Sequence, residues 1–290
     1  MQERSNAMKV AVLGTGIMGS GISVALAAKD FDVTAWNRTF EKAVALETTN
    51  LHAERSLEAA VADADVILIV AFDADSVLDI MNRCAQSAPS QAIWVQMATI
   101  GAAGAHDFRD FVTAHSMRAV EMMMMGSREQ AATSHLILIG GGDPQLFSLL
   151  EPVTTAIAQK TIHAGDNIGA GTAVKLACNA WIAGITATAA QSVQLLEHEH
   201  TDPQLFLNVI SGGTSDSPYA HLKGGKMISH DYSSQFEVSA LRKDMQLMRE
   251  VMSATGMRTD FLDEVMSLYS EADAKGHTHS DISAVAEAFA

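Results

Sequence analysis

Short apolar runs alternate with stretches of helical periodicity along the first half of the chain. The runs are nearly continuous in apolar residues and cover residues 9–13, 33–36, 66–71, 93–97, 117–125 and 136–139, and a short strand-like stretch follows at residues 160–163. Helical periodicity follows the first run, over residues 17–29, and precedes the strand-like stretch, over residues 144–158. Strands that are apolar throughout are typical of a sheet covered on both faces. The pattern therefore predicts an α/β fold with a Rossmann-type doubly wound parallel sheet.

No strand pattern follows residue 165. The remaining periodic stretches are helical and cover residues 168–196, 202–210, 238–255 and 259–274. We therefore predict two domains, an α/β domain over residues 8–164 and an all-α C-terminal domain over residues 165–290. Residues 1–7 are polar and resemble an expression remnant, so they are left out of the fold prediction.

The stretch over residues 168–196 is long enough to span a bilayer and holds a single formal charge. It is built mainly of alanine, glycine and threonine, and it also carries Lys175, Asn179, Gln191 and Gln194. This composition favours a buried helix between the two domains over a membrane span. We expect a cytoplasmic protein with no membrane partner.

The net charge of −15 argues against a nucleic-acid partner, because binding to phosphates needs a concentrated basic surface. Cys84 and Cys178 are far apart, which favours two free thiols in a reducing compartment over a disulfide framework or a zinc site. His198 and His200 are two residues apart and do not share a helix face, so no metal site is predicted.

A glycine-rich loop joins the first predicted strand to the first helix, with the sequence Gly14-Thr15-Gly16-Ile17-Met18-Gly19. Gly14 permits a tight turn, Gly16 lets a diphosphate approach the backbone, and Gly19 lets helix and strand pack closely. The N-terminus of the helix adds free N–H groups and the positive end of the helix dipole. The loop therefore predicts a dinucleotide site to which all six residues contribute.

The end of the second predicted strand indicates which dinucleotide binds. An enzyme that uses NAD usually has Asp or Glu here for the ribose 2′-hydroxyl, but this chain has Asn37-Arg38-Thr39, with Lys42 one turn later. A guanidinium suits a 2′-phosphate because it can donate two parallel hydrogen bonds. NADP is the predicted cofactor, and some use of NAD stays open. The alternative for Arg38 is a solvated surface arginine.

Gly171, Lys175 and Asn179 recur every four residues and so lie on one helix face. Glycine at the first position would make room for a ligand against the backbone. Lys175 is the only formal charge in its long apolar stretch, and an ammonium without a partner is costly to bury. Such a lysine either extends its ammonium to solvent, pairs with a carboxylate, or serves chemistry, in which it donates a proton to a developing alkoxide.

These motifs resemble those of the β-hydroxyacid dehydrogenase family, which includes 3-hydroxyisobutyrate dehydrogenase and semialdehyde reductases and has a 6-phosphogluconate dehydrogenase-type NAD(P)-binding domain. The glycine loop with Met18 before its last glycine is similar to the family's signature. The more specific match is the segment with Gly169, Gly171, Lys175 and Asn179. The resemblance implies that Lys175 is the catalytic acid/base and that Asn179 binds the substrate or orients the lysine.

Two further positions are similar to those of the family. Thr99 follows the fourth predicted strand, where the family has a Ser-Thr pair at the nicotinamide end of the cofactor. Lys243 and Asp244 match a Lys-Asp pair whose lysine reaches the cofactor from the C-terminal domain. The resemblance also implies that the first domain binds NADP, that the second serves substrate binding and dimerisation, and that the protein is a homodimer.

One segment departs from the family pattern. The family's Asp-Ala-Pro-Val-Ser-Gly-Gly is replaced by a run with four consecutive methionines over residues 121–127. The expected substrate-binding positions, together with Gly171, are Met125, Gly126 and Ser127. Methionine offers a flexible apolar wall where a serine hydroxyl would suit a carboxylate, so we expect an altered substrate pocket. Met122 and Met124 are expected to fill the core.

The sequence thus predicts an NADP-dependent oxidoreductase that transfers a hydride between NADPH and a small carbonyl compound or β-hydroxyacid. An imine reductase is an alternative, because that group resembles this family and has a more apolar pocket, although it usually replaces the lysine. A second alternative is a non-catalytic NADP-binding module. Loss of the substrate serine suggests it, and the retained Lys175 and Asn179 oppose it.

Overall fold

The computed structural model describes residues 8–290, and the predicted expression remnant at residues 1–7 lies outside the described residues. The chain forms two compact units that divide between Lys175 and Leu176. The sequence analysis placed the boundary at residue 165. The two divisions differ because residues 170–175, which begin a long helix, pack with the first unit. An α/β unit followed by an all-helical unit confirms the predicted fold class.

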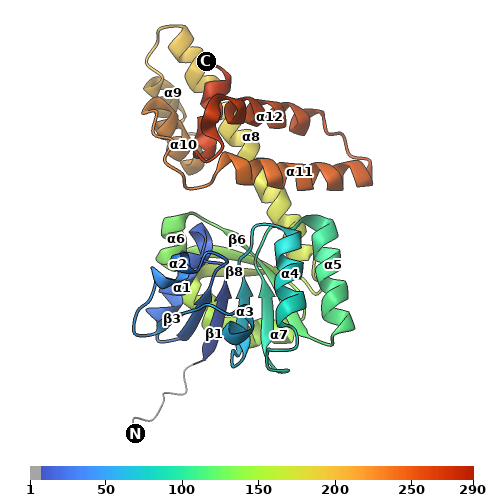
Figure 1. The fold of residues 1–290 in the computed structure, drawn as a ribbon. Helices are drawn as coiled ribbons and strands as arrows, with labels where there is room; N and C mark the ends of the chain where they lie inside the picture. The colour runs from blue at the N-terminus through green and yellow to red at the C-terminus, as the bar shows by residue number, and fades with distance from the viewer. Residues whose placement is uncertain (1–7) are drawn as a thin grey trace. The chain divides into compact units, whose positions relative to one another are not determined.

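One sheet of eight strands forms the N-terminal unit, with the order β3-β2-β1-β4-β5-β6-β7-β8 (Figure 1). The strands are β1 (Lys9–Leu13), β2 (Asp32–Trp36), β3 (Leu51–Glu54), β4 (Val66–Ile69), β5 (Ile93–Gln96), β6 (Arg118–Met125), β7 (Leu136–Gly141) and β8 (Ala158–Gly165). Neighbouring strands are parallel except β6 and β7, so the sheet is mostly parallel, as predicted, and contains one antiparallel pair. Residues 126–135 join this pair, and that connection is shorter than the crossover of about a dozen residues that parallel strands need.

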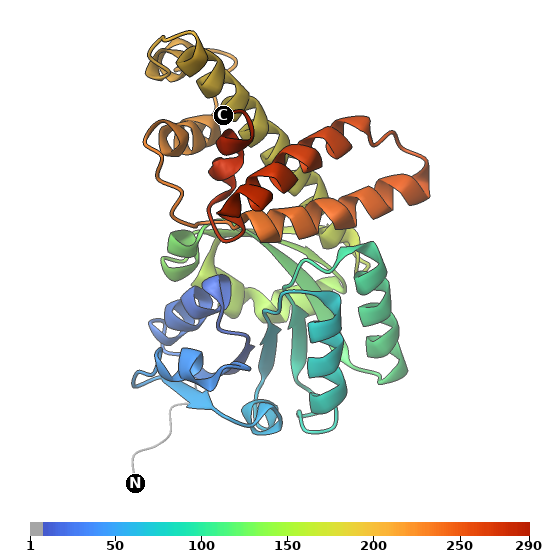
Figure 2. The same ribbon diagram turned by 45° about the horizontal axis from the view of Figure 1, so that its top comes forward.

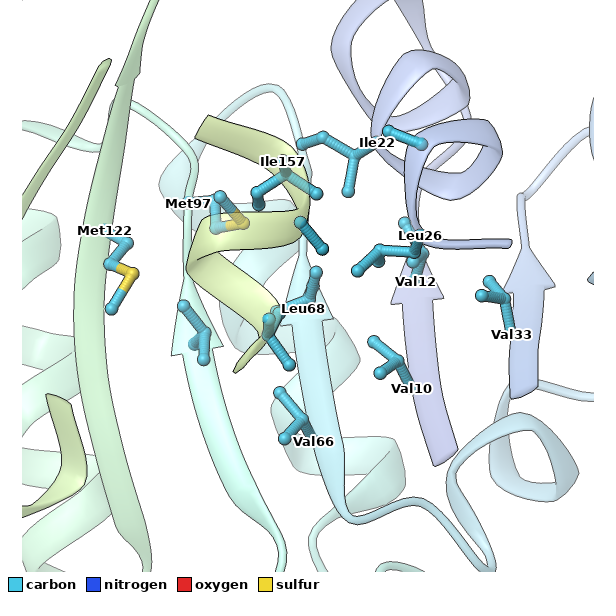
Figure 3. Close-up of a cluster of buried hydrophobic side chains, with 14 of the residues drawn as sticks. Val10, Val12, Ile22, Leu26, Val33, Val66, Leu68, Met97, Met122 and Ile157 are labelled. Atoms are coloured by element: carbon cyan, nitrogen blue, oxygen red, sulfur yellow. The ribbon is translucent and has the colours of Figure 1, made fainter. Parts of the chain in front are cut away.

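Helices cover both faces of the sheet. They are α1 (Ile17–Ala27), α2 (Phe40–Val44), α3 (Leu57–Val61), α4 (Ala74–Cys84), α5 (Gly101–Ala114), α6 (Arg128–Ala132) and α7 (Pro144–Ile157). Side chains of a strand alternate between faces, so Val10 and Val12 of β1 pack with α1 and α7, whereas Ala11 and Leu13 pack with α3, α4 and α5. Figure 3 shows the first of these cores. The central strands β1, β4 and β5 are therefore buried on both faces, as their apolar runs predict, whereas most residues of the edge strand β8 are exposed.

Strand β3 and helix α10 were not expected from the sequence. Strand β3 reads Leu-His-Ala-Glu and lies at the edge of the sheet, where only Leu51 is buried, so it lacks the continuous apolar pattern of the central strands. Helix α10 (Pro218–Ile228) contains Gly224 and Gly225, which weaken helical periodicity. Its start is set locally, because the Ser217 hydroxyl accepts a hydrogen bond from the N–H of Tyr219.

The C-terminal unit is helical, as predicted. Its helices are α8 (Ala170–His198), of which the first turns belong to the N-terminal unit, α9 (Gln204–Ile210), α10, α11 (Val238–Thr255) and α12 (Asp260–Ala272), followed by a 3-10 helix (Ile282–Ala288). Its core joins Val193 of α8, Met245 of α11, Tyr269 of α12 and Val285 of the last helix, all of them fully buried. Figure 2 shows α11 and α12 side by side.

Helix α8 is the one helix among residues 8–290 that is long and apolar enough to cross a membrane. The sequence analysis expected it to be buried, but only one side of it is. Ala190 and Val193 are fully buried in the core of the C-terminal unit, whereas Trp181 is 68% exposed and Leu195 is 61% exposed. The helix therefore supplies a core face and leaves two large apolar side chains, Trp181 and Leu195, exposed.

A buried ion pair joins the end of the chain to α10. Lys223 Nζ donates to both carboxylate oxygens of Asp281, at 2.8 and 2.9 Å, and both side chains are almost fully buried. Asp281 also accepts hydrogen bonds from the N–H groups of Gln235, Phe236 and Ser283. Burial alone would raise the pKa of Asp281, but the Lys223 ammonium and the hydrogen bonds hold this pKa below its ordinary value. One carboxylate thus connects three segments of the unit.

Candidate functional site

The carboxyl ends of several parallel strands lie at one edge of the sheet. Strand pairing aligns Leu13 with both Trp36 and Ile69, and it aligns Ile69 with Gln96. Strand β6 is parallel to β5, extends past Gln96 and ends at Met125. Residues that follow these strand ends are therefore neighbours, at the edge where open α/β sheets bind ligands.

The glycine loop follows β1 at this edge. Gly14 has a φ of +113°, and a Cβ there would lie 2.2 Å from the carbonyl oxygen of Val70. A Cβ at Gly19 would lie 1.8 Å from the carbonyl oxygen of Gly14. By contrast, no atom lies within 4 Å of the position that a Gly16 Cβ would take. Gly14 and Gly19 therefore allow close packing, and Gly16 leaves the backbone open to a phosphate.

The start of helix α1 completes a site for an anion. Gly16 is its N-cap, and within the described residues no side chain caps the first N–H groups and no acidic residue lies in the first turn. Ile17 and Met18 are half-buried beside it. Free N–H groups and the positive end of the helix dipole attract phosphate. The loop fits the diphosphate of a dinucleotide, as the sequence predicts.

Asn37 connects the glycine loop to the end of β2. Its Oδ1 accepts a hydrogen bond from the N–H of Thr15 at 3.1 Å, and its Nδ2 donates to the carbonyl oxygen of Thr39 at 3.0 Å. The sequence predicts a cofactor contact for Asn37, but here its amide holds the loop. The Thr15 hydroxyl oxygen is buried without a hydrogen-bond partner among residues 8–290, so it can serve a ligand.

Three residues predicted to recognise a 2′-phosphate are exposed at the end of β2: Arg38, Thr39 and Lys42. Thr39 is the N-cap of α2. Across the described part of the chain, no carboxylate forms an ion pair with Arg38. Its guanidinium can therefore receive a phosphate.

A second arginine at this edge was missed by the sequence analysis. Arg55 follows β3, whose last residue pairs with Trp36 of β2. Its guanidinium carbon lies 3.9 Å from the centre of the Phe40 ring, and its carbonyl oxygen accepts a hydrogen bond from Trp36 Nε1 at 3.2 Å. An arginine directly after a strand is the signal that could have identified it, but β3 itself was not recognised.

Thr99 lies in the connection between β5 and α5 and is half-buried. The carbonyl oxygen of Ala98 accepts a hydrogen bond from the buried Gln96 amide at 2.8 Å, which holds this turn. The Met97 N–H donates to the carbonyl oxygen of Ile69. Thr99 is therefore held at the same sheet edge as the glycine loop. A residue that contacts the nicotinamide end of the cofactor would have to lie at this edge.

Lys175 lies near the start of α8. Its Nζ donates to the carbonyl oxygen of Met124 at 2.8 Å and lies 3.3 Å from Sδ of Met125. Both methionines are half-buried at the end of β6, and Met124 also packs against the core, whereas Met122 is almost fully buried. The structure therefore brings the predicted acid/base and the predicted substrate residue Met125 together.

The residues after Met125 have local roles. Gly126 has a φ of +144°, and Ser127 begins α6 with a capping box. The Ser127 N–H donates to Gln130 Oε1 at 2.8 Å, and the Ser127 hydroxyl oxygen accepts from the Gln130 N–H at 3.3 Å. Ser127 was predicted to contact substrate, but these groups are used in the cap.

Glu121 contacts the start of α8, which the sequence analysis did not foresee. Its carboxylate is 1% exposed and accepts hydrogen bonds from the N–H groups of Gly169, Gly171 and Thr172. A Cβ at Gly171 would lie 2.7 Å from the carbonyl oxygen of Ile139. Gly171 therefore lets α8 pack against the sheet, and the room for a ligand that the sequence suggested is filled.

A second polar group lies in the C-terminal unit. Asn179 Nδ2 donates to Asp244 Oδ2 at 2.6 Å, and both side chains are buried. Asp244 Oδ1 lies 2.8 Å from Lys243 Nζ. Lys243 also lines a cavity of about 340 Å³ between α11 and α12, which is bordered by Ser239, Arg242, Gln246, Met266 and Ser270. Asp244 thus contacts both residues of this unit that the sequence predicts for the site, Asn179 and Lys243.

Within residues 8–290, no group of three or more His, Cys, Asp or Glu side chains is arranged to hold a metal ion. Both cysteines are free thiols, and burial raises the pKa of the Cys84 thiol to about 12.

Two family models together match nearly all of the described chain. Residues 9–165 match the NAD-binding domain of 6-phosphogluconate dehydrogenase, and residues 169–289 match the NAD-binding domain of NADP-dependent 3-hydroxyisobutyrate dehydrogenase. The first match alone covers more than half of the chain. The N-terminal unit is thus a domain that binds a nicotinamide dinucleotide.

Relatives and solved structures agree with these models. An uncharacterized oxidoreductase of Synechocystis sp. is 31% identical over 84% of this chain and 86% of its own length. Glyoxylate/succinic semialdehyde reductase 2 of Arabidopsis thaliana is 27% identical over 97% of this chain and 79% of its length. Mycobacterium tuberculosis 3-hydroxyisobutyrate dehydrogenase with L-serine shares the fold, with a TM-score of 0.88 and 24% identity over 97% of this chain and 98% of that one.

Imine reductases of solved structure have the lower TM-scores of 0.65 and 0.66. The two matched family models and the Synechocystis oxidoreductase, which is 31% identical over 84% of this chain, agree with one another. The chain belongs to the β-hydroxyacid dehydrogenase family.

Proposed function

We propose that the protein is an NADP-dependent oxidoreductase that transfers a hydride between NADPH and a small carbonyl compound or β-hydroxyacid. The observation that carries this proposal is the position of Lys175. Its ammonium is held by the carbonyl oxygen of Met124 at the end of β6. The glycine loop and Thr99 follow strands that end at the same sheet edge.

Lys175 serves as the general acid and base in this proposal. When bound, NADPH supplies the hydride that reaches the carbonyl carbon. The carbonyl oxygen then takes a proton from Lys175 Nζ, and in the reverse direction Nζ accepts the proton of the hydroxyl group. The carbonyl of Met124 orients the ammonium, and the thioether of Met125 gives the site an apolar wall.

The proposed substrate class is based on the family and on the apolar thioether of Met125 beside Lys175. Relatives named as semialdehyde reductases and 3-hydroxyisobutyrate dehydrogenases support a small carbonyl or hydroxyacid substrate. An imine reductase is not favoured, since Lys175 is retained and those structures are less similar. A non-catalytic module is not favoured either, because Lys175 and Asn179 are retained and relatives are named as reductases and dehydrogenases. Turnover of semialdehydes but not of a cyclic imine, with NADPH, would support the proposal.

Arg38 is expected to give the protein its preference for NADPH. Calorimetric titration should show NADPH binding at least tenfold tighter than NADH, which corresponds to about 1.4 kcal/mol. Arg38→Ala should remove most of this difference by weakening NADPH alone, because NADH has no 2′-phosphate. Arg109→Ala, an exposed arginine of α5, is the matched control and should leave both affinities unchanged. Equal affinities in the parent protein would contradict the choice of NADP.

A homodimer in the cytoplasm completes the proposal. Trp181 and Leu195 of α8 and Phe261 of α12 are large apolar side chains exposed in the single chain, and a second copy would cover such surface. Light scattering should give twice the mass of one chain, and Trp181→Glu should shift the distribution toward monomer. A parent protein that is monomeric at micromolar concentration would contradict the dimer.

A further inference from the structure

The start of α8 depends on an acceptor from another element. The first N–H groups of a helix have no partner within it, and buried ones must find acceptors elsewhere. Glu121 Oε1 accepts from the N–H groups of Gly169, Gly171 and Thr172 at 2.7, 2.7 and 3.1 Å. Glu121 Oε2 accepts from Thr172 Oγ1 at 2.6 Å. One carboxylate of β6 therefore satisfies this whole group of donors.

The space around this carboxylate is made by glycines. A Cβ at Gly141 would lie 2.7 Å from Glu121 Oε1, and a Cβ at Gly171 would lie 3.2 Å from the same oxygen. With no side chain at either position, the carboxylate fits between β7 and α8. A buried charge is tolerated when it is fully hydrogen-bonded, and the positive end of a helix dipole favours an anion. Glu121 is therefore accommodated as a buried side-chain cap at the N-terminus of α8.

The cap and Lys175 are attached to the same strand. Glu121 and Met124 both belong to β6, and Thr172 and Lys175 both lie near the start of α8. The carboxylate holds the helix at Thr172, and the carbonyl of Met124 receives Lys175 Nζ at 2.8 Å. A shift of the helix start would therefore move the ammonium away from its acceptor.

We infer that Glu121 is the positioning residue of Lys175, which it aligns by capping α8. The inference rests on the proposed role of Lys175 as acid/base. Glu121 acts through the helix, so its loss should slow hydride and proton transfer without weakening NADPH binding. A misplacement of about 1 Å costs about 100-fold in rate.

The test compares Glu121→Gln, which keeps the side-chain size, with Glu121→Ala. We expect kcat to fall about 10-fold in the first and about 100-fold in the second, for the fastest semialdehyde substrate. The isotope effect with C4-deuterated NADPH should rise, because the chemical step becomes slower, and NADPH affinity should stay within about twofold. Thr172→Val removes one hydrogen bond and should cost less than Glu121→Gln. If Glu121→Ala does not fold, Glu121→Gln decides the test.

A double-mutant cycle separates positioning from a merely structural role. Adding Glu121→Gln to Lys175→Met should slow the enzyme no further, because the group to be aligned is already absent. A Glu121→Gln enzyme with unchanged kcat and isotope effect, or a full multiplication of the two losses, would overturn the inference. If Lys175→Met itself is fully active, the proposed function fails instead, so the two failures are distinguishable.

Discussion

Replacing Lys175 with methionine is expected to lower kcat for carbonyl reduction by about 1,000-fold, within the range that general acid catalysis contributes. Methionine keeps the length and the apolar stem of lysine but removes the ammonium that donates to the carbonyl oxygen of Met124. The residues expected to hold NADPH, among them Gly16 and Arg38, are untouched. Affinity for NADPH should therefore stay within about twofold of the parent value. Steady-state kinetics and calorimetric titration measure both quantities.

An exposed lysine of the same unit gives the matched control. Lys29 follows α1 and is exposed, so Lys29→Met should leave kcat and NADPH affinity unchanged. If Lys175→Met keeps more than about a tenth of the parent kcat, another group donates the proton and the proposed mechanism is wrong. If it also loses NADPH affinity, the lysine contributes mainly to cofactor binding.

Replacing Asp281 with asparagine is expected to lower the free energy of unfolding by about 3–5 kcal/mol, the usual effect of breaking a buried ion pair. The substitution leaves the Lys223 ammonium buried without an anion. It also weakens the hydrogen bonds that Asp281 accepts from the N–H groups of Gln235, Phe236 and Ser283. Urea unfolding of the C-terminal unit, followed by circular dichroism, measures the loss.

An exposed ion pair of the same unit is the control. Arg258 and Asp260 are 89% and 71% exposed, so Arg258→Met should cost less than about 1 kcal/mol. A loss of less than about 1 kcal/mol in Asp281→Asn as well would show that the buried pair does not stabilise the unit.

The same carboxylate should make stability depend on pH. Because the pKa of Asp281 is below its ordinary value in the folded protein, the folded state binds fewer protons here than the unfolded state. The stabilisation is therefore present above the unfolded pKa of about 3.9 and is lost as the pH falls below it. Unfolding measured between about pH 3 and pH 5 should show a steeper loss in the parent than in Asp281→Asn.

The strands were predictable where the pattern was local. β1, β4 and β5 are apolar at nearly every position, and the sequence placed each of them within two residues of the observed bounds. β3 was missed because an edge strand with one buried residue has no such pattern. The antiparallel direction of β7 was also missed. Direction depends on the length of the connection, which apolar periodicity does not describe.

The site was predictable where its residues are close in sequence. The glycine loop is contiguous, and Lys175 and Asn179 are one helical turn apart. Glu121 was not identified, because its partner Gly171 is 50 residues away. Arg55 was missed for a related reason, since its place beside Phe40 depends on the pairing of β3 with β2.

By itself, the sequence determined the α/β class, the dinucleotide loop and the helix that carries Lys175, because each depends on periodicity or short spacing. Only the tertiary structure decided that Glu121 caps α8, that Asp281 pairs with Lys223 and that the units divide between Lys175 and Leu176. These features join segments that are far apart in the chain. Strand order and chain direction bring such segments together, and local patterns do not specify either.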